Sequence, residues 1–173
     1  MHMNGGIVMI CYQKATLEDL EKIWDCHISE NPEDIRYLRW KQEFITRNVT
    51  NQAVTFVIIA DNTPLGEVTL DFFASSYSGN REQLADGKHT AYVTALRIRK
   101  EFEGHGHVSK LMQVMEDYAS KEGFSRLTIG VEAAETRNLA IYLHWGYDQF
   151  VMSEIDGDEL VLFYAKTLPS CKL

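Results

Sequence analysis

Residues 90–121 constrain the fold more than any other part of the chain. Residues 90–99 are apolar and rich in β-branched side chains, which favours a strand, and a turn that contains Gly104 and Gly106 follows them. Residues 107–121 then carry apolar side chains at helical spacing, and Gly123 stands where a helix cap is favoured. The segment therefore predicts a strand that leads through a glycine turn directly into an amphipathic helix.

The rest of the chain alternates between strand and helix patterns. Thr16, with Asp19 three residues later, approximates a capping box and predicts the start of a helix; Asn31 before Pro32 predicts the start of another, which runs to about residue 47. The remaining patterns predict one more helix, over 135–145, and strands over 7–13, 53–60, 66–73, 126–131, 146–152 and 159–166. This order is neither purely parallel nor a βαβ repeat, and it predicts an α/β (α+β) fold in which about four helices cover a mixed sheet of about seven strands.

The length of the chain is typical of one domain. Its 173 residues contain no internal repeat and no linker, so we expect a single domain over residues 7–168. Residues 1–6 are typical of a cloning remnant and are expected to be flexible, and residues 169–173 form a tail. Residues 75–88 are polar and longer than most connections, which predicts a functional loop.

Charge and cysteine usage restrict the class of protein. The formal net charge of −8 argues against a nucleic acid or an anionic membrane as the main partner and fits cationic ligands better, although acidity also serves solubility alone. The cysteines Cys11, Cys26 and Cys171 are odd in number and widely separated, which suits a reducing compartment. With no signal-peptide pattern and no apolar run of membrane-spanning length, we expect a cytoplasmic protein.

The glycine turn before the predicted helix at 107–121 is a candidate phosphate site. The first N–H groups of a helix lack internal partners and lie at the positive end of the helix dipole. Gly104 and Gly106 would let the backbone approach an anion closely. Because the chain has neither a G-x-G-x-x-G dinucleotide fingerprint nor a P-loop, the commonest nucleotide-binding classes are excluded.

This strand and turn resemble the acetyl-CoA-binding motif of GNAT acetyltransferases, an L-x-V-type strand followed by [RQ]-x-x-G-x-[GA]. Residues 96–98, Leu-Arg-Ile, match the strand, and residues 103–108 align with the loop. Gly106 is kept, whereas Glu103 stands where the family favours Arg or Gln, and Val108 where it favours Gly or Ala. A carboxylate that faces a diphosphate is unfavourable unless it turns outward.

A second resemblance lies downstream, in residues 142–147. Tyr142 and the Gly146-Tyr147 pair resemble the Y-x-x-x-G-[FY] ending of the family's next helix and strand. The Asn that often stands seven residues before the Tyr is Glu135 here, whereas Asn138 lies four residues before it, on the same helical face. The choice between these two residues stays open.

The resemblance implies a GNAT-like fold with a mostly antiparallel sheet, and an N-acetyltransferase that uses acetyl-CoA and no metal. Tyr142 is implied as the general acid that protonates the departing thiolate, with a packed core tyrosine as the alternative. Backbone amides near Leu96 and Ile98 are implied to hold the pantetheine arm and the acetyl oxygen. The residues implied to bind the cosubstrate are Leu96, Arg97, Ile98, Glu103, Gly104, His105, Gly106, His107, Val108, Ser109 and Asn138.

The general base is harder to identify from the sequence. Glu67 and Asp71 alternate with apolar residues in the predicted strand 66–73, so both are candidates for the base or for attracting a cation. The competing interpretation is that both are solvated carboxylates at a sheet edge. His89 is a third candidate, with an exposed loop histidine as the alternative, while His105 and His107 fall short of a metal site.

The acceptor is expected to be a small-molecule amine. The acidity of the chain fits small cationic amines such as polyamines or aminoglycosides. A peptide N-terminus and a lysine side chain are the alternative acceptors. The departures at Glu103 and Val108 motivate an alternative, a non-catalytic acyl-CoA-binding or sensing domain, and a structural or interaction module is a third possibility. A homodimer is also left open.

Overall fold

The computed structural model describes residues 9–73 and 82–169 of the chain. The expected N-terminal segment 1–6, most of the tail 169–173 and part of the loop 75–88 lie outside these residues, as does Cys171. The elements are β1 (Ile10–Lys14), α1 (Leu17–Glu30), α2 (Arg36–Val49), β2 (Ala53–Ala60), β3 (Thr63–Asp71), β4 (Thr90–Ile98), η2 (Lys100–Phe102), α3 (His107–Lys121), β5 (Arg126–Glu132), α4 (Thr136–His144), β6 (Gln149–Asp156) and β7 (Glu159–Thr167).

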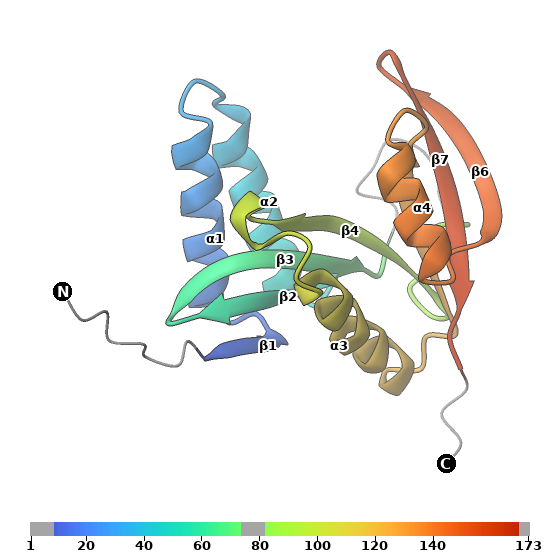
Figure 1. Cartoon of the computed structure of the whole chain (residues 1–173), viewed down its shortest axis with the longest axis horizontal. Coiled ribbons are helices and arrows are strands. Elements are labelled where there is room, and N and C mark those ends of the chain that lie inside the picture. The colour runs from blue at the N-terminus through green and yellow to red at the C-terminus, as the bar shows by residue number, and fades with distance from the viewer. Residues whose placement is uncertain (1–8, 74–81, 170–173) are drawn as a thin grey trace.

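The seven strands form one sheet in the order β1-β2-β3-β4-β5-β7-β6 (Figure 1). Among the described strands, β4 and β5 are the only parallel neighbours, and every other pair is antiparallel. This confirms the predicted mixed, mostly antiparallel sheet. No helix in the described residues is long and apolar enough to cross a membrane.

Helices cover both faces of the sheet. On one face, Ile23 and Trp24 of α1 pack with Val57 of β2, and aromatic side chains of α2 join them. On the other face, Leu111 and Met115 of α3 lie in the main apolar core that the central strands share. Side chains of α4 pack against that same core, so α1 and α2 form one layer and α3 and α4 the other.

The structure confirms the predicted cap at the start of α1 but not the predicted start of α2. Thr16 and Asp19 form a reciprocal capping box, in which the Thr16 hydroxyl accepts from the Asp19 N–H at 3.1 Å. The prediction that Asn31 and Pro32 begin the second helix is wrong, because α2 begins at Arg36. Asn31 instead ends α1: its N–H donates to the Ile28 carbonyl, so the polar residue caps the earlier helix and not the later one.

A β-bulge divides β4 into two halves. Thr94 pairs with Thr69 of β3, but Arg97 pairs with Glu67, so β4 contains one extra residue between these two pairs. Ala95, within this bulge, has φ 50°, the left-handed conformation that a residue other than glycine rarely adopts. The parallel pairing of β4 with β5 ends at Val93, before the bulge, so beyond it the two strands separate.

Candidate active site

Two cavities meet at the end of β4, where it has left β5. The α3–α4 cavity, of about 600 Å³, is bounded by the end of β4, the turn before α3 and one side of α4. The α1–β4 cavity, of about 810 Å³, is bounded by α1, the start of β3 and residues 97–101. Arg97 and Ile98 line both cavities, so the two spaces adjoin across two residues of one strand.

The entrance to α3 gives the α3–α4 cavity its capacity for anions. Gly104 and Gly106 have φ of 77° and 79°, and a Cβ added to either would meet nothing within 4 Å, so both backbones face open space. Gly106 is the N-cap of α3, and no side chain caps the helix there. The first N–H groups of α3 are therefore available to an anion.

The exposed carboxylate of Glu103 has a partner that the sequence did not reveal. Its Oε2 lies 3.9 Å from Nη1 of Arg137, in the first turn of α4. Arg137 also lines the cavity, so it adds a cation beside the phosphate-binding turn and offsets the charge of Glu103. The position of Arg137 at the start of the helix predicted over 135–145 could have indicated a cation near the turn before α3.

The side chains of α4 close the same cavity. Tyr142 lines it with its ring centroid 6.0 Å from that of Trp145, and burial, followed by the charge of Glu135, raises the pKa of the Tyr142 phenol. Asn138 lines the cavity and donates to the Glu135 carboxylate at 3.1 Å, while Glu135 is the N-cap residue of α4. Of these two residues, Asn138 lines the cavity and Glu135 does not.

Tyr147, the second aromatic of that motif, belongs to the core. It is fully buried, and its hydroxyl donates to Glu116 of α3 at 3.1 Å. Lys166 donates to the other oxygen of Glu116 at 2.7 Å. Burial, with the Glu116 charge as the next cause, raises the pKa of Tyr147 well above its usual value. This network fixes the end of α4 to α3 and β7, and so holds Tyr142 in place.

The α1–β4 cavity contains a buried carboxylate paired with a histidine. Glu67 is 1% exposed, and its Oε1 lies 2.7 Å from Nε2 of His27 and 3.6 Å from Nη1 of Arg97. Its Oε2 is buried and has no hydrogen-bond partner among the described residues. His27 was not among the residues that the sequence singled out, because nothing local to α1 shows which strand residue it meets.

Asp71 has a different environment from Glu67, although both lie on the same face of β3. It is fully buried and forms an ion pair with Arg47 of α2. It lines neither the α1–β4 cavity nor the α3–α4 cavity. The interpretation of Glu67 and Asp71 as solvated carboxylates at a sheet edge is wrong for both, because β3 is an inner strand and helices cover this face.

The remaining histidine candidates lie apart from these groups. His89 precedes β4 at the end opposite the cavities, and its Nδ1 lies 4.0 Å from Asp86. His107 lines the α3–α4 cavity and bonds the Tyr12 hydroxyl at 2.7 Å, whereas His105 lines neither cavity. Within residues 9–73 and 82–169, no group of three or more His, Cys, Asp or Glu side chains is arranged to hold a metal ion.

Comparison with known proteins gives a consistent result. Residues 16–147 match the family model described as "Acetyltransferase (GNAT) family". An N-acetyltransferase from Staphylococcus aureus Mu50 is 17% identical, with a TM-score of 0.67, over 93% of this chain and 99% of that one. PaiA N-acetyltransferase from Thermoplasma acidophilum, solved with coenzyme A, is 18% identical over 92% and 99% of the chains, with a TM-score of 0.60. At these identities the structures show a shared fold. No curated protein sequence gives a significant match.

NAA60 from Arabidopsis thaliana has been solved with acetyl-CoA. It is 15% identical to this chain, with a TM-score of 0.67, over 92% of this chain and 99% of that one. Structures with coenzyme A or acetyl-CoA bound are therefore among those that share the fold.

Proposed function

The chain belongs to the GNAT family of acetyltransferases, and we propose that it transfers the acetyl group of acetyl-CoA to a primary amine. Acetyl-CoA is the cosubstrate, and it supplies an activated acetyl thioester. The observation that carries the amine proposal is the junction of the two cavities at Arg97 and Ile98. A donor bound in the α3–α4 cavity and an acceptor bound in the α1–β4 cavity would approach each other at these two residues.

The α3–α4 cavity offers the groups that would hold acetyl-CoA. The N–H groups at the start of α3, with Gly104 and Gly106 before them, suit the diphosphate. The backbone of β4 beyond Val93 still pairs with β3 but no longer with β5, so the amides that point away from β3 are available to the pantetheine arm and the acetyl oxygen. Arg137 is suited to a phosphate, and Asn138 to a polar group of the cosubstrate.

The Glu67–His27 pair is the best candidate for removing a proton from the amine. An amine must be neutral to attack a thioester. When Nε2–H of His27 donates to the Glu67 carboxylate, Nδ1 of the neutral ring is left as a proton acceptor. His27 is the more exposed member of the pair, at 18% against 1% for the side chains, so it is the one an acceptor can contact. Asp71 is a weaker candidate because Arg47 pairs with it away from both cavities.

Tyr142 is suited to return a proton to the departing sulfur. Its side chain faces the α3–α4 cavity, and its raised pKa keeps the phenol protonated at physiological pH. With a proton acceptor on one side of the end of β4 and a proton donor on the other, this arrangement favours an enzyme over a non-catalytic acyl-CoA-binding domain.

Two measurements on the purified chain test this proposal. Acetyl-CoA should raise the melting temperature, because it binds the native state. Acetyl-CoA mixed with an amine panel should then release free thiol in proportion to the acetylated product. Binding without release for any amine would leave the non-catalytic alternative, and no binding would leave a structural module.

A further inference from the structure

The α1–β4 cavity has a mixed charge, which the net charge of the chain does not suggest. Three carboxylates, from Glu30, Glu67 and Glu101, line it together with three cations, from Arg97, Arg99 and Lys100. A site that selected a purely cationic amine would show an excess of carboxylates. The cavity is therefore suited to a ligand that carries both signs of charge.

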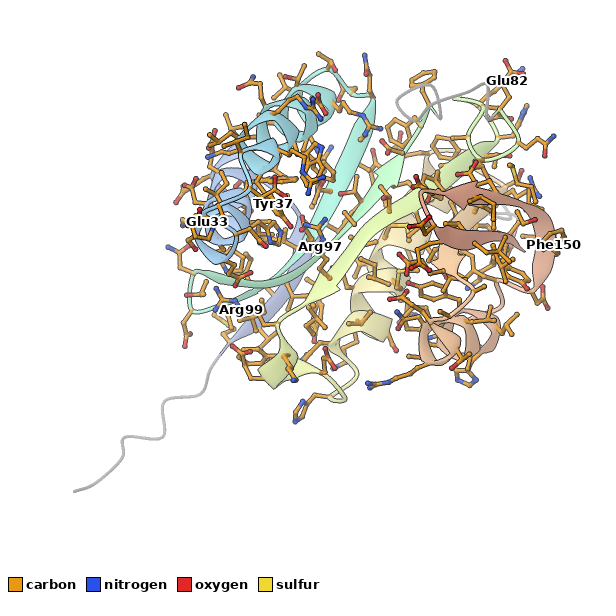
Figure 2. All side chains as sticks on the ribbon, turned by 90° about the horizontal axis from the view of Figure 1, so that it is seen from above. Glu33, Tyr37, Glu82, Arg97, Arg99 and Phe150 are labelled. Atoms are coloured by element: carbon orange, nitrogen blue, oxygen red, sulfur yellow. The ribbon has the colours of Figure 1, made fainter. Side chains whose placement is uncertain are left out.

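Arg97 lies in β4, and Arg99 lies one residue past its end, where its N–H still bonds the Leu65 carbonyl of β3 and continues the strand pairing. Residues two apart on a strand point to the same face with their Cα atoms about 6.6 Å apart. Both side chains reach the layer of α1 and α2, Arg97 through its contact with Glu67 and Arg99 through Cys26 of α1 (Figure 2). The two guanidinium groups thus face one space, with Tyr37 of α2 also lining it.

Within the described part of the chain, the side-chain contacts of the two guanidinium groups leave most of their N–H donors unused. A guanidinium carries five N–H donors in a planar fork that matches a carboxylate or a phosphate. Arg99 donates one bond, at 3.6 Å, to the Sγ of Cys26, and a thiol is a weak acceptor. Arg97 lies 3.6 Å from Glu67, an ion pair too long for a hydrogen bond. Two cations are thus available to an anion beside the candidate base.

We propose that the acceptor carries an anionic group, a carboxylate or a phosphate, within a few bonds of its amine, and that Arg97 and Arg99 bind that group. This inference rests on the proposed acetyl transfer to an amine. The 3.6 Å between Arg97 and Glu67 sets the spacing: an ammonium held at the Glu67–His27 pair puts a neighbouring anion within reach of Arg97. An α-amino acid or an aminoalkyl phosphate has this arrangement, whereas a polyamine does not.

The first test uses the unaltered protein and matched acceptors. Each free amino acid is compared with its C-terminal amide and its decarboxylated amine, phosphoethanolamine is compared with ethanolamine, and spermidine represents the polyamines. We expect kcat/KM to be at least tenfold higher for the anionic member of the preferred pair. The amino acid and phosphate arms distinguish the two sources of the anion.

The second test locates the anion. Arg99→Gln should raise KM for the preferred acceptor about tenfold to a hundredfold, with a much smaller change in kcat. KM for the matched amine that lacks the anionic group should not change. Arg99→Lys should recover part of the loss. Arg126→Gln is the matched control, because Arg126 bonds the Gln83 carbonyl and lines neither cavity, and it should behave like the unaltered protein.

The outcomes separate this inference from the proposed function. Acetylation of amines with no preference for the anionic member, or with spermidine as the best acceptor, would overturn the inference and leave the acetyltransferase proposal standing. Failure to acetylate any amine, despite acetyl-CoA binding, would overturn both. An anion preference that Arg99→Gln leaves intact would overturn the assignment to Arg99.

Discussion

The two cavities at the end of β4 are built from different parts of the polypeptide. The proposed phosphate site of the α3–α4 cavity is formed by backbone, from two glycines in the left-handed conformation and the uncapped start of α3. The α1–β4 cavity contains charged side chains from α1, β3 and β4, with Glu67 in contact with both His27 and Arg97. One cavity suits a ligand shared by a whole family, and the other suits a ligand particular to this chain.

This difference has a physical basis. Main-chain N–H groups can bind a diphosphate with little dependence on the nearby side chains, so we expect the α3–α4 cavity to bind it despite Glu103 and Val108. Side-chain recognition depends on the chemical identity of each group and on the distances between them. We therefore expect substitutions in the α1–β4 cavity to change turnover and acceptor choice, and those in the turn before α3 to change mainly cosubstrate affinity.

The largest effect is expected from Glu67, the carboxylate that holds His27 with its Nδ1 free to accept a proton. General base catalysis contributes roughly 10² to 10⁴-fold, so Glu67→Gln should lower kcat/KM for the acceptor by up to that amount while acetyl-CoA affinity stays unchanged. Steady-state kinetics and a calorimetric titration measure the two quantities.

Asp71→Asn is the matched control for Glu67→Gln. It alters the Arg47 ion pair on the same face of β3, and breaking a buried pair costs about 3–5 kcal/mol. Its melting temperature should fall, while kcat/KM measured well below that temperature should not. If both variants lost activity and stability in parallel, the role of Glu67 would be structural.

Tyr142→Phe is expected to lower kcat by about 10²-fold or less, because a thiolate is a moderate leaving group that needs only partial help. The ring remains, so acetyl-CoA affinity and thermal stability should change little. Since burial raises the pKa of Tyr142, the phenol keeps its proton at pH values where a free tyrosine, of pKa about 10, begins to lose it. If Tyr142 is the proton donor, loss of its proton should not lower the kcat of the unaltered protein as the pH rises to about 10. A large loss of stability would instead indicate a structural tyrosine.

The glycine before α3 offers a test of the backbone-built cavity. Gly106→Ala adds a Cβ in the space proposed for the phosphate, and loss of a hydrogen bond to a charged group costs roughly 1.5–3 kcal/mol, so acetyl-CoA should bind about tenfold more weakly or worse. Gly123→Ala is the control, because Gly123 also has a left-handed φ, 93°, and open space around it, at the other end of the same helix. Both variants should lose similar stability from backbone strain. Equal acetyl-CoA affinity in the two would contradict the assignment of the phosphate to this turn.

The smallest effect is expected from Glu103. Glu103→Gln removes a negative charge near the proposed phosphate and frees Arg137 from its ion pair. An exposed pair contributes about 0.2–1 kcal/mol, so acetyl-CoA should bind up to about fivefold more tightly, and the gain should shrink as salt is added. Isothermal titration at two ionic strengths measures both trends, and weaker binding by Glu103→Gln would show that the carboxylate helps the cosubstrate.

The sequence predicted those features that depend on neighbours along the chain. The bounds of α3 and β2 are those expected, because helical spacing and an apolar β-branched run are local signals. The turn before α3 and the Tyr142 motif each lie within one short segment, and their predicted residues, apart from His105, gather in one cavity.

The α1–β4 cavity could not be predicted in the same way. His27 and Glu67 are 40 residues apart, and only the packing of α1 on β3 brings them together. The alternation in β3 indicated that Glu67 and Asp71 share a face. Their different partners depend on which side chain of the α1–α2 layer contacts each one. The same limit explains Asn31, whose residue type suits either end of a helix.

The extra residue in β4 allows one strand to follow two different alternation patterns. Ala91 and Val93 point to the core before the bulge, and Leu96 and Ile98 point to it afterwards, so the spacing of inward side chains changes once, at the bulge near Ala95. If the pairing with β3 continued past Thr94 without a bulge, the regular alternation would turn every later side chain to the opposite face. Leu96 would then lie opposite Glu67, and a guanidinium would be directed into the apolar core. A single added residue thus lets this strand build a hydrophobic interior with its first half and a charged reaction site with its second.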